Sequence, residues 1–408
     1  MATRAVVLFT RDLRVHDNPA LAAAIRENDS VVPLFVLDER VPAPRNRVAF
    51  LLESLRDLRE SLGGALVVRR GDPVREAAAF EADAIYLASD VSSYARERER
   101  GLASVAAVRT FPGITVVPAG SLVPASRDHY RVFTPYWRVW RAEPLPAAET
   151  ARLPVELPRG IDPGLIPEAA STGLMPGGER AGLARLEAFL AGSASAYDEQ
   201  RDLPAVEGTS RLSPYLHFGC VSPTEATRRA TAAGLDGFVR QLCWRDFFAQ
   251  LLAARPSLAY ESLKPAPGGW RDDPDALEAW KAGVTGYPIV DAGMRQLLAE
   301  GWMHNRVRMI VASFLTKDLL IHWREGAAHF AEHLIDGDVA SNAGNWQWVA
   351  GTGADTRPSR MFNPTRQGER FDPTGDYVRR YVAGPEHPEP IVDHAFAVER
   401  FRRTRSSI

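Results

Sequence analysis

Short apolar runs alternate with helical patterns through the first third of the chain. The nearly continuous apolar runs, typical of strands buried on both faces, fall at residues 5–9, 31–37, 65–68, 84–87 and 114–117. Between them, residues 18–27 and 48–62 place apolar side chains at helical spacing. Strands that alternate with helices predict a doubly wound α/β domain with a parallel sheet, which we assign to residues 1–135. No G-x-G-x-x-G follows the first run, so the pattern does not predict a dinucleotide bound there.

The pattern changes in the middle of the chain. Residues 136–180 are rich in Pro, Ala and Gly and lack sustained periodicity, so we expect an inter-domain connector over the surface. From about residue 181 helical periods dominate through Phe330, with breaks at Ser213-Pro214 and Ser222-Pro223. The last 40 or so residues are rich in Pro and Arg and end in a predicted Arg-bearing helix over residues 395–405, and we assign the second domain to residues 181–408. We therefore expect a mostly α-helical second domain.

Composition narrows the class of protein. The chain has 408 residues, of which 45% are hydrophobic and 25% charged, as in ordinary globular proteins. No apolar run approaches the roughly 20 residues of a membrane span, and the first one is too short for a signal peptide. Cys220 and Cys243 are the only cysteines, which argues against a disulfide framework and favours a reducing, cytoplasmic location. The net charge of -2 excludes a uniformly basic nucleic-acid binder but allows one local basic face.

The most unusual stretch is DGDVASNAGNWQW, residues 336–348. It sets Trp346 and Trp348 among small and polar residues and fits neither an amphipathic helix nor an alternating strand, so we interpret it as a loose loop. Asp336 and Asp338 could pair on a metal, but no His or further acid stands at ligand spacing from them, and we expect no metal site. No G-x-S-x-G elbow occurs, which argues against a hydrolase.

Three other segments combine polar and aromatic residues. Residues 208–214 either hold a phosphate at a helix start or form an ordinary helix cap. Residues 302–309 are predicted to be helical, with His304 a packed histidine rather than an acid–base group. Residues 241–247 form a helix that packs Trp244 inward or presents it to a ligand, and Cys243 has the character of a small buried hydrophobe.

Together these motifs resemble the cryptochrome/photolyase family, and within it class I cyclobutane pyrimidine dimer photolyases. The resemblance covers nearly the whole chain in family order, through residues 9–18, 209–213, 286–308, 336–348 and 361–364. It implies an α/β antenna domain and a helical domain that holds FAD in a folded shape. The implied activity is that of a carbon–carbon lyase, which uses blue or near-ultraviolet light to split pyrimidine dimers by electron transfer from photoexcited reduced FAD.

The resemblance also assigns roles to individual residues. The implied FAD pocket comprises Tyr197, Thr209, Ser210, Arg211, Leu212, Ser213, Arg245, Trp302, Arg308, Asp336, Asp338 and Asn342. Asn342 would face the flavin N5, where plant cryptochromes carry an acid and insect cryptochromes a cysteine. Because an amide does not readily donate its protons to the flavin, this residue favours repair over signalling. Trp346, Trp323 and Trp270 match the family's electron-relay tryptophans, in order from flavin to surface.

The implied partner is ultraviolet-damaged DNA, bound by a protein that we expect to be a monomer. The dimer must be flipped out of the duplex to be reached. The residues that would contact the lesion are Gln241, Trp244, Asn305, Arg306, Met309 and Trp348. Gln241 stands where class I enzymes usually carry Glu, as in (6-4) photolyases, but those carry a His-His pair where this chain has His304-Asn305. Dimer repair at reduced efficiency is therefore favoured over (6-4) repair.

Other readings stay open. A blue-light photoreceptor without repair activity is the main alternative, and a DNA-binding module with a vestigial flavin pocket is a further one. For an antenna chromophore, residues 90–100 with Tyr94 resemble the type that binds 8-hydroxy-deazaflavin more than the type that binds methenyltetrahydrofolate. The implied antenna contacts are the Val36 backbone, Arg47 and Asp90, and an empty site or another flavin is also compatible with the sequence.

Overall fold

The computed structural model describes residues 3–41, 44–168, 175–266, 269–354, 357–382, 384 and 388–406. The chain divides into two compact units. Unit 1 comprises Met1–Tyr130, Thr134–Gly192 and Ser210–Pro256, and unit 2 comprises Arg131–Phe133, Ser193–Thr209 and Ser257–Ile408. The boundaries expected from the sequence, at residues 135 and 180, stay a prediction.

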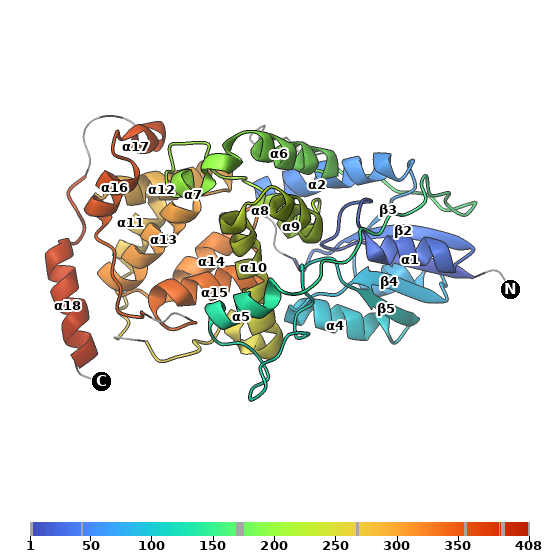
Figure 1. Cartoon of the computed structure of the whole chain (residues 1–408), viewed down its shortest axis with the longest axis horizontal. Coiled ribbons are helices and arrows are strands. Elements are labelled where there is room, and N and C mark those ends of the chain that lie inside the picture. The colour runs from blue at the N-terminus through green and yellow to red at the C-terminus, as the bar shows by residue number, and fades with distance from the viewer. Residues whose placement is uncertain are drawn as a thin grey trace. The chain divides into compact units, whose positions relative to one another are not determined.

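Unit 1 is built on a five-stranded parallel sheet with the strand order β3-β2-β1-β4-β5 (Figure 1). The strands are β1 (Arg4–Leu8), β2 (Ser30–Leu37), β3 (Val67–Arg70), β4 (Ala84–Ala88) and β5 (Ala107–Phe111). Val6, Leu34 and Ile85 belong to its buried core. The strand order reverses between β1 and β4, which is where open α/β sheets bind ligands. The predicted doubly wound sheet is confirmed.

The fifth strand was predicted in the wrong place. The sheet ends in β5, at residues 107–111, and not in the apolar run at 114–117. Val116 and Val117 instead donate their backbone N–H groups to Asp246 Oδ2, each at 2.9 Å. This apolar run is therefore buried beside a carboxylate rather than in the sheet, whereas most of β5 is exposed and lacks the apolar continuity of a buried strand.

Helices surround the sheet and extend unit 1. They are α1 (Pro19–Glu27), α2 (Arg45–Ser61), α3 (Pro73–Ala78), α4 (Ser93–Leu102), α5 (Phe133–Trp140), α6 (Glu179–Ala191), α8 (Ser213–Phe218), α9 (Pro223–Ala232) and α10 (Asp236–Ala254). Helix α1 begins where it does because Asn18 accepts a hydrogen bond from the Leu21 N–H at 3.1 Å and Pro19 occupies the first turn.

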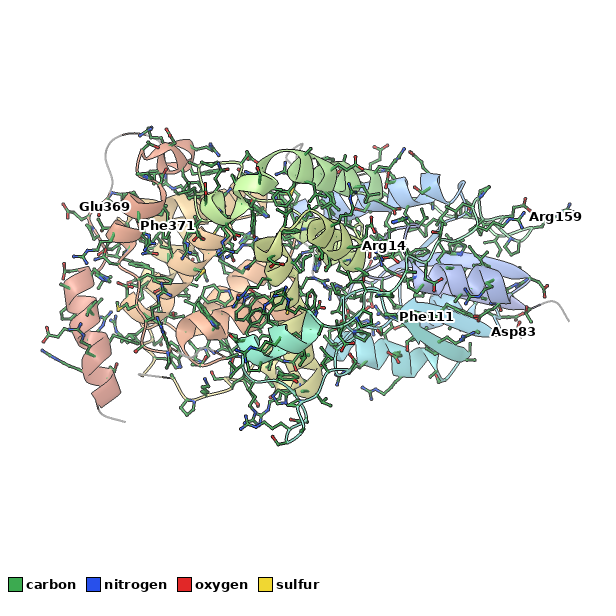
Figure 2. All side chains as sticks on the ribbon, viewed as in Figure 1. Arg14, Asp83, Phe111, Arg159, Glu369 and Phe371 are labelled. Atoms are coloured by element: carbon green, nitrogen blue, oxygen red, sulfur yellow. The ribbon has the colours of Figure 1, made fainter. Side chains whose placement is uncertain are left out.

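A buried arginine fixes the turn between β1 and α1. Arg14, labelled in Figure 2, is 1% exposed and donates to the carbonyls of Asp17, Gly113 and Gly219 at 2.9–3.1 Å. These acceptors satisfy the donors of a charge that would otherwise be costly to bury. Most of the predicted connector, residues 141–168 and 175–178, contains no helix, while its residues 169–174 lie outside the described part of the chain.

Unit 2 is helical, as predicted (Figure 1). Its α-helices are α7 (Tyr197–Gln200), α11 (Pro274–Ala282), α12 (Pro288–Glu300), α13 (Asn305–Ser313), α14 (Trp323–His333), α15 (Val339–Ala350), α16 (Pro364–Phe371), α17 (Asp376–Tyr381) and α18 (His394–Ser406). A π-helical turn, Phe314–Asp318, continues α13, and 3-10 turns lie at Ser193–Ala196 and Pro256–Ala259. The core of this unit includes Val290, Trp280 and Trp323.

Two local expectations are corrected in unit 2. The loose loop expected at residues 336–348 is mostly helix α15, which Asp338 caps by accepting the Ser341 N–H at 2.7 Å. Its small residues do not loosen it, because Ala343 and its neighbours are buried against other helices. The helix expected over residues 302–309 begins only at Asn305, because His304 Nδ1 accepts the Arg306 N–H and forms the cap.

No helix in the described residues is both long and apolar enough to cross a bilayer.

Candidate cofactor pocket and active site

Unit 2 contains a pocket of about 90 Å³ between helices α13, α14 and α15. Both polar and apolar side chains line it. The residues that line it are Asn305, Arg308, Met309, Ala312, Phe330, Leu334, Asp336, Ser341, Asn342, Asn345, Trp346 and Val349.

An ion pair forms part of the polar wall. Arg308 on α13 donates from Nη1 and Nη2 to the two carboxylate oxygens of Asp336, at 3.1 and 2.9 Å. Its Nε donates to the Met303 carbonyl at 2.8 Å, which fixes the orientation of the guanidinium. The Asp336 side chain is only 3% exposed and that of Arg308 is 23% exposed. A bidentate arginine–carboxylate ion pair is strong and geometrically specific.

Asn342 adds an amide in the first turn of α15. Its Nδ2 donates to the Ala327 carbonyl of α14 at 2.8 Å, and its backbone N–H donates to the Asp338 carbonyl at 2.8 Å. With the amide nitrogen engaged in this way, the side-chain oxygen is left to accept a hydrogen bond from a ligand. One turn further along α15, Asn345 donates from its side-chain nitrogen to the Ser341 carbonyl at 2.7 Å.

Trp346 forms an aromatic part of the wall and is held from several sides. It is 2% exposed, and its ring lies edge-on to Phe330 and Trp280, with centroids 5.0 and 6.0 Å away. Gly326 of α14 lies directly against the indole, because a Cβ placed on this glycine would be 2.6 Å from Trp346 Cζ2. The absence of a side chain at residue 326 therefore makes room for this ring.

Two further tryptophans of unit 2 are connected through a histidine. Trp323 is fully buried and donates from its indole nitrogen to Ser262 Oγ at 3.0 Å. The His322 ring lies 5.7 Å from the Trp323 ring and 4.8 Å from the Trp270 ring, between centroids. Trp270 is only partly buried. The three indoles at 346, 323 and 270 thus run from buried positions to a partly exposed one.

Comparison with known proteins identifies the family. The family model for DNA photolyase matches residues 5–155, and that for the FAD binding domain of DNA photolyase matches residues 238–387. The deoxyribodipyrimidine photo-lyase of Streptomyces griseus is 46% identical over 450 residues, which covers 98% of this chain and 99% of that protein. The chain belongs to the photolyase/cryptochrome family.

Other members of the family are similar over their full length. The deoxyribodipyrimidine photo-lyase of Thermus thermophilus is 41% identical, with 96% of each chain covered. A class III photolyase from Agrobacterium tumefaciens superposes with a TM-score of 0.90 at 34% identity, covering 100% of this chain and 98% of that one. An archaeal photolyase from Sulfolobus tokodaii, described as holding two FAD molecules, gives a TM-score of 0.89 at 31% identity and full coverage of both chains.

The pocket brings together six of the site residues expected from the resemblance to photolyases. These are Asn305, Arg308, Met309, Asp336, Asn342 and Trp346. The other expected residues of unit 2 lie outside its lining: Tyr197, Thr209, Trp302, Arg306, Asp338, Trp348, Trp323 and Trp270. Tyr197 and Trp302 are buried, at 8% and 5% exposure. Burial raises the pKa of Tyr197 to about 12, so its hydroxyl is protonated at neutral pH.

Arg306, expected beside the lesion, is engaged within unit 2. Its Nε and Nη2 contact the two carboxylate oxygens of Asp202, at 3.2 and 2.8 Å. Its guanidinium also lies over the ring of Phe371, 4.4 Å from the centroid; Phe371 is labelled in Figure 2. Any contact of Arg306 with a DNA phosphate would therefore share or replace the bond to Asp202.

The remaining expected residues belong to unit 1. Leu212 and Ser213 form the start of α8, Arg211 has a left-handed backbone with φ of 50°, and the Ser210 carbonyl accepts from Arg185 Nε at 2.9 Å. Arg245 on α10 donates to the carbonyls of Leu216, at 3.0 Å, and Ile114. On the same helix Gln241 is exposed and Trp244 is half-buried.

The sequence analysis missed half of the pocket lining. The missed residues are Ala312, Phe330, Leu334, Ser341, Asn345 and Val349. Ser341 and Asn345 stand in the 336–348 motif, so their polarity was an available signal. Phe330 and Leu334 follow an ordinary i, i+4 apolar pattern, which does not distinguish a residue that lines a pocket from one that packs in a core.

The donor set of the pocket fits FAD, the cofactor for which the matched family model is named. A flat ring system with polar atoms along one edge suits a site that combines an ion pair and an amide with the apolar faces of Trp346 and Phe330. Arg308, Asp336 and Asn342 would hold the polar edge.

The residues expected around an antenna lie near one edge of the sheet in unit 1. Val36 stands next to the last residue of β2, Arg47 lies in the first turn of α2, and Asp90 follows the end of β4. Because the carboxyl ends of parallel strands meet at one edge of a sheet, these three positions are brought together there. Asp90 accepts the Ser92 N–H at 3.1 Å and lies 3.4 Å from the Arg11 guanidinium.

Proposed function

We propose that this protein is a light-driven DNA repair enzyme that splits cyclobutane pyrimidine dimers. The observation that carries the proposal is the pocket of unit 2, which the Arg308–Asp336 pair, Asn342 and Trp346 line together. Curated relatives named deoxyribodipyrimidine photo-lyase support it, since they match the chain at 37–46% identity over nearly its whole length.

Bound FAD would supply the light-driven electron that opens the cyclobutane ring of the dimer. The chain's own residues position and support it. Arg308 and Asp336 hold a polar edge, and because their charges neutralise each other, they do so without adding net charge to the pocket. Asn342 offers a hydrogen-bond acceptor and does not readily release a proton, which distinguishes it from the acid that plant cryptochromes carry at this position.

Trp346, Trp323 and Trp270 would pass electrons from the partly exposed indole toward the one that lines the pocket. Indole suits this role because a positive charge spreads over its two fused rings. The buried environments of Trp346 and Trp323 keep water away from the relay, while the exposed part of Trp270 is accessible to a reductant in solution.

The lesion would be flipped out of the duplex and held by Gln241, Trp244, Asn305, Arg306, Met309 and Trp348. Aromatic contacts contribute about 1–3 kcal/mol per base, which offsets part of the unstacking free energy. Because the overall charge is -2, phosphate binding must come from a local cluster of arginines rather than from the whole surface.

The test is light-dependent repair by the flavin-loaded protein. Purified protein is reduced and mixed with oligonucleotides that carry either a cyclobutane dimer or a (6-4) lesion, in light and in darkness. We expect loss of the cyclobutane dimer in light only. If the reduced, flavin-loaded protein repairs neither lesion, the photoreceptor reading replaces this one.

The choice of lesion is tested with Gln241→Glu. A carboxylate supplies the negative charge that an amide lacks beside a base that becomes protonated, so the variant should repair the cyclobutane dimer faster than the parent. Better repair of the (6-4) lesion than of the dimer by the parent would overturn the proposed substrate.

We further propose that unit 1 binds an antenna chromophore through the Val36 backbone, Arg47 and Asp90, with 8-hydroxy-deazaflavin favoured over methenyltetrahydrofolate. A second flavin is the alternative, since the relative from Sulfolobus tokodaii is described with two FAD molecules and a novel light-harvesting cofactor. Asp90→Asn should release a deazaflavin-type chromophore while FAD is retained, as measured by the absorption of the bound pigments. A monomeric state and a cytoplasmic location stay predictions.

A further inference from the structure

Three potential metal ligands gather in the last turns of α14, and none of them lines the pocket described above. His329, Glu332 and His333 each offer a ligand atom, and these atoms all lie within 4.8 Å of one another. The spacing i, i+3, i+4 places the three side chains on one face of the helix. The two imidazole rings are 4.5 Å apart between centroids.

His329 is the fixed member of the group. It is 6% exposed, its ring lies edge-on to the buried Trp280 with centroids 5.6 Å apart, and its Nε2 has no hydrogen-bond partner in the part of the chain that the structure describes. Buried polar atoms are nearly always paired, so this nitrogen needs an explanation. A nitrogen that ligates a metal must be unprotonated, and a bound metal ion would give His329 Nε2 the partner that it lacks among the described residues.

The charged side chains that face His329 from the neighbouring helix largely cancel each other. They are Lys281 and Glu278 of α11, which form a 2.8 Å ion pair. Glu332 is the one acidic side chain within the cluster itself. The carboxyl-terminal end of a helix carries a partial negative charge as well, and His333 is the last residue of α14.

We propose that His329, Glu332 and His333 form a site for a divalent metal ion of the zinc type. Two imidazole nitrogens and one carboxylate oxygen are ligands that zinc prefers, and a water molecule would complete the four-coordinate shell from the solvent side. Ligand atoms around a tetrahedral zinc ion lie about 3.4 Å apart. The exposed Glu332 and the half-buried His333 therefore need to rotate inward by roughly 1 Å, while His329 stays in place.

This site revises the expectation that the chain holds no metal. That expectation considered only the surroundings of Asp336 and Asp338, whereas the signal was the H-x-x-E-H spacing of residues 329–333. The site is independent of the proposed repair activity, because it uses none of the residues assigned to FAD, the electron relay or the lesion.

The test measures metal binding directly on the full-length, flavin-loaded protein without an affinity tag of histidines. Zn²⁺ is titrated against a competing chelator dye, and Co²⁺ is added separately to record the visible absorption of a four-coordinate site. We expect one tight Zn²⁺ per chain and a four-coordinate Co²⁺ band. Cys220 and Cys243 do not compete for these ions, because both are fully buried.

The matched variants separate this site from other binding. Loss of a supporting group beside a metal ligand typically weakens binding by about 10–100-fold, so H333A and E332Q, which remove a ligand, should weaken Zn²⁺ binding at least about tenfold. E325Q, an exposed acid on the same helix, and H16A, a histidine of unit 1, should bind as the parent does.

Retained flavin absorption verifies that the two ligand variants are folded, which is expected because neither side chain is buried. Equal Zn²⁺ affinity of H333A and the parent would overturn the proposal. So would a parent protein that gives no four-coordinate Co²⁺ band.

Discussion

Replacing Gly326 with alanine tests whether the position of Trp346 is set by this glycine. In an exposed helix, the change would stabilise the protein by about 1 kcal/mol, because alanine is the better helix former. Here the new Cβ would lie 2.6 Å from Trp346 Cζ2 and 2.5 Å from Cζ3, so the indole must move by roughly 1 Å. Phe330 and Trp280 oppose that movement, and overpacking of this kind destabilises by about 1–3 kcal/mol.

We therefore expect Gly326→Ala to lower the free energy of unfolding by up to about 2 kcal/mol, which is the overpacking loss less the helix gain. In a folded unit of this size that corresponds to a decrease in Tm of about 2–4 °C for each kcal/mol. Thermal unfolding of the flavin-loaded protein, followed by circular dichroism, measures the shift. Since Trp346 lines the pocket, photoreduction in blue light should also slow.

Gly368→Ala is the matched control. This glycine lies inside α16, and a Cβ there would meet Ile289 at 3.6 and 3.8 Å, which is ordinary contact. The substitution should therefore stabilise unit 2 by about 0.5–1 kcal/mol. A Gly326→Ala variant that is as stable as Gly368→Ala, and is photoreduced at the parent rate, would refute the packing argument.

Three other substitutions probe the pocket and unit 1. Trp346→Phe should stop photoreduction but leave repair by chemically reduced protein intact, and loss of both would refute the relay. Asp336→Asn leaves Arg308 without its charged partner and should weaken FAD binding by about 1.5–3 kcal/mol, measured by fluorescence titration; unchanged affinity contradicts this role. Burial raises the pKa of Asp246 to about 6 from 3.8, so the folded state holds a proton that the unfolded state has released. The free energy of unfolding should therefore fall as the pH rises from about 4 to about 6. Urea unfolding at several pH values measures this dependence, and Asp246→Asn should remove it. An equal pH dependence in the parent and the variant would contradict the assignment to Asp246.

The sequence predicted the elements that local pattern determines. Four of the five strands of unit 1 and the helices after β1 and β2 were located, because continuous apolar runs and helical periods are properties of the chain itself. The fifth strand was misplaced because the backbone N–H groups of Val116 and Val117 donate to the Asp246 carboxylate, which is distant in sequence, and not to a neighbouring strand of the sheet. An apolar run indicates that residues are buried and does not indicate what buries them.

Of the residues that line the pocket of unit 2, the sequence predicted the polar ones better than the apolar ones. Arg308, Asp336 and Asn342 were assigned through the resemblance to photolyases, and physical reasoning adds that charged and amide groups are costly to bury without a partner. Phe330, Leu334 and Val349 were not assigned, because an apolar side chain on the wall of a pocket has the same sequence pattern as one in a core. The capping role of Asp338 was also missed, and with it the helical state of residues 339–350.

Helix α10 carries both a residue that stabilises the fold, Asp246, and residues that are proposed to contact the substrate, Gln241 and Trp244. Asp246 accepts hydrogen bonds at 2.9 Å from the backbone of the 116–117 segment and from Trp140 Nε1, and is fully enclosed. Gln241 is exposed and Trp244 only half-buried on the same helix. A substitution at 241 therefore leaves the anchoring carboxylate untouched. Under the proposed lesion contact, residue 241 can therefore change over evolutionary time without a loss of stability, so a new substrate preference would require no compensating change elsewhere in α10.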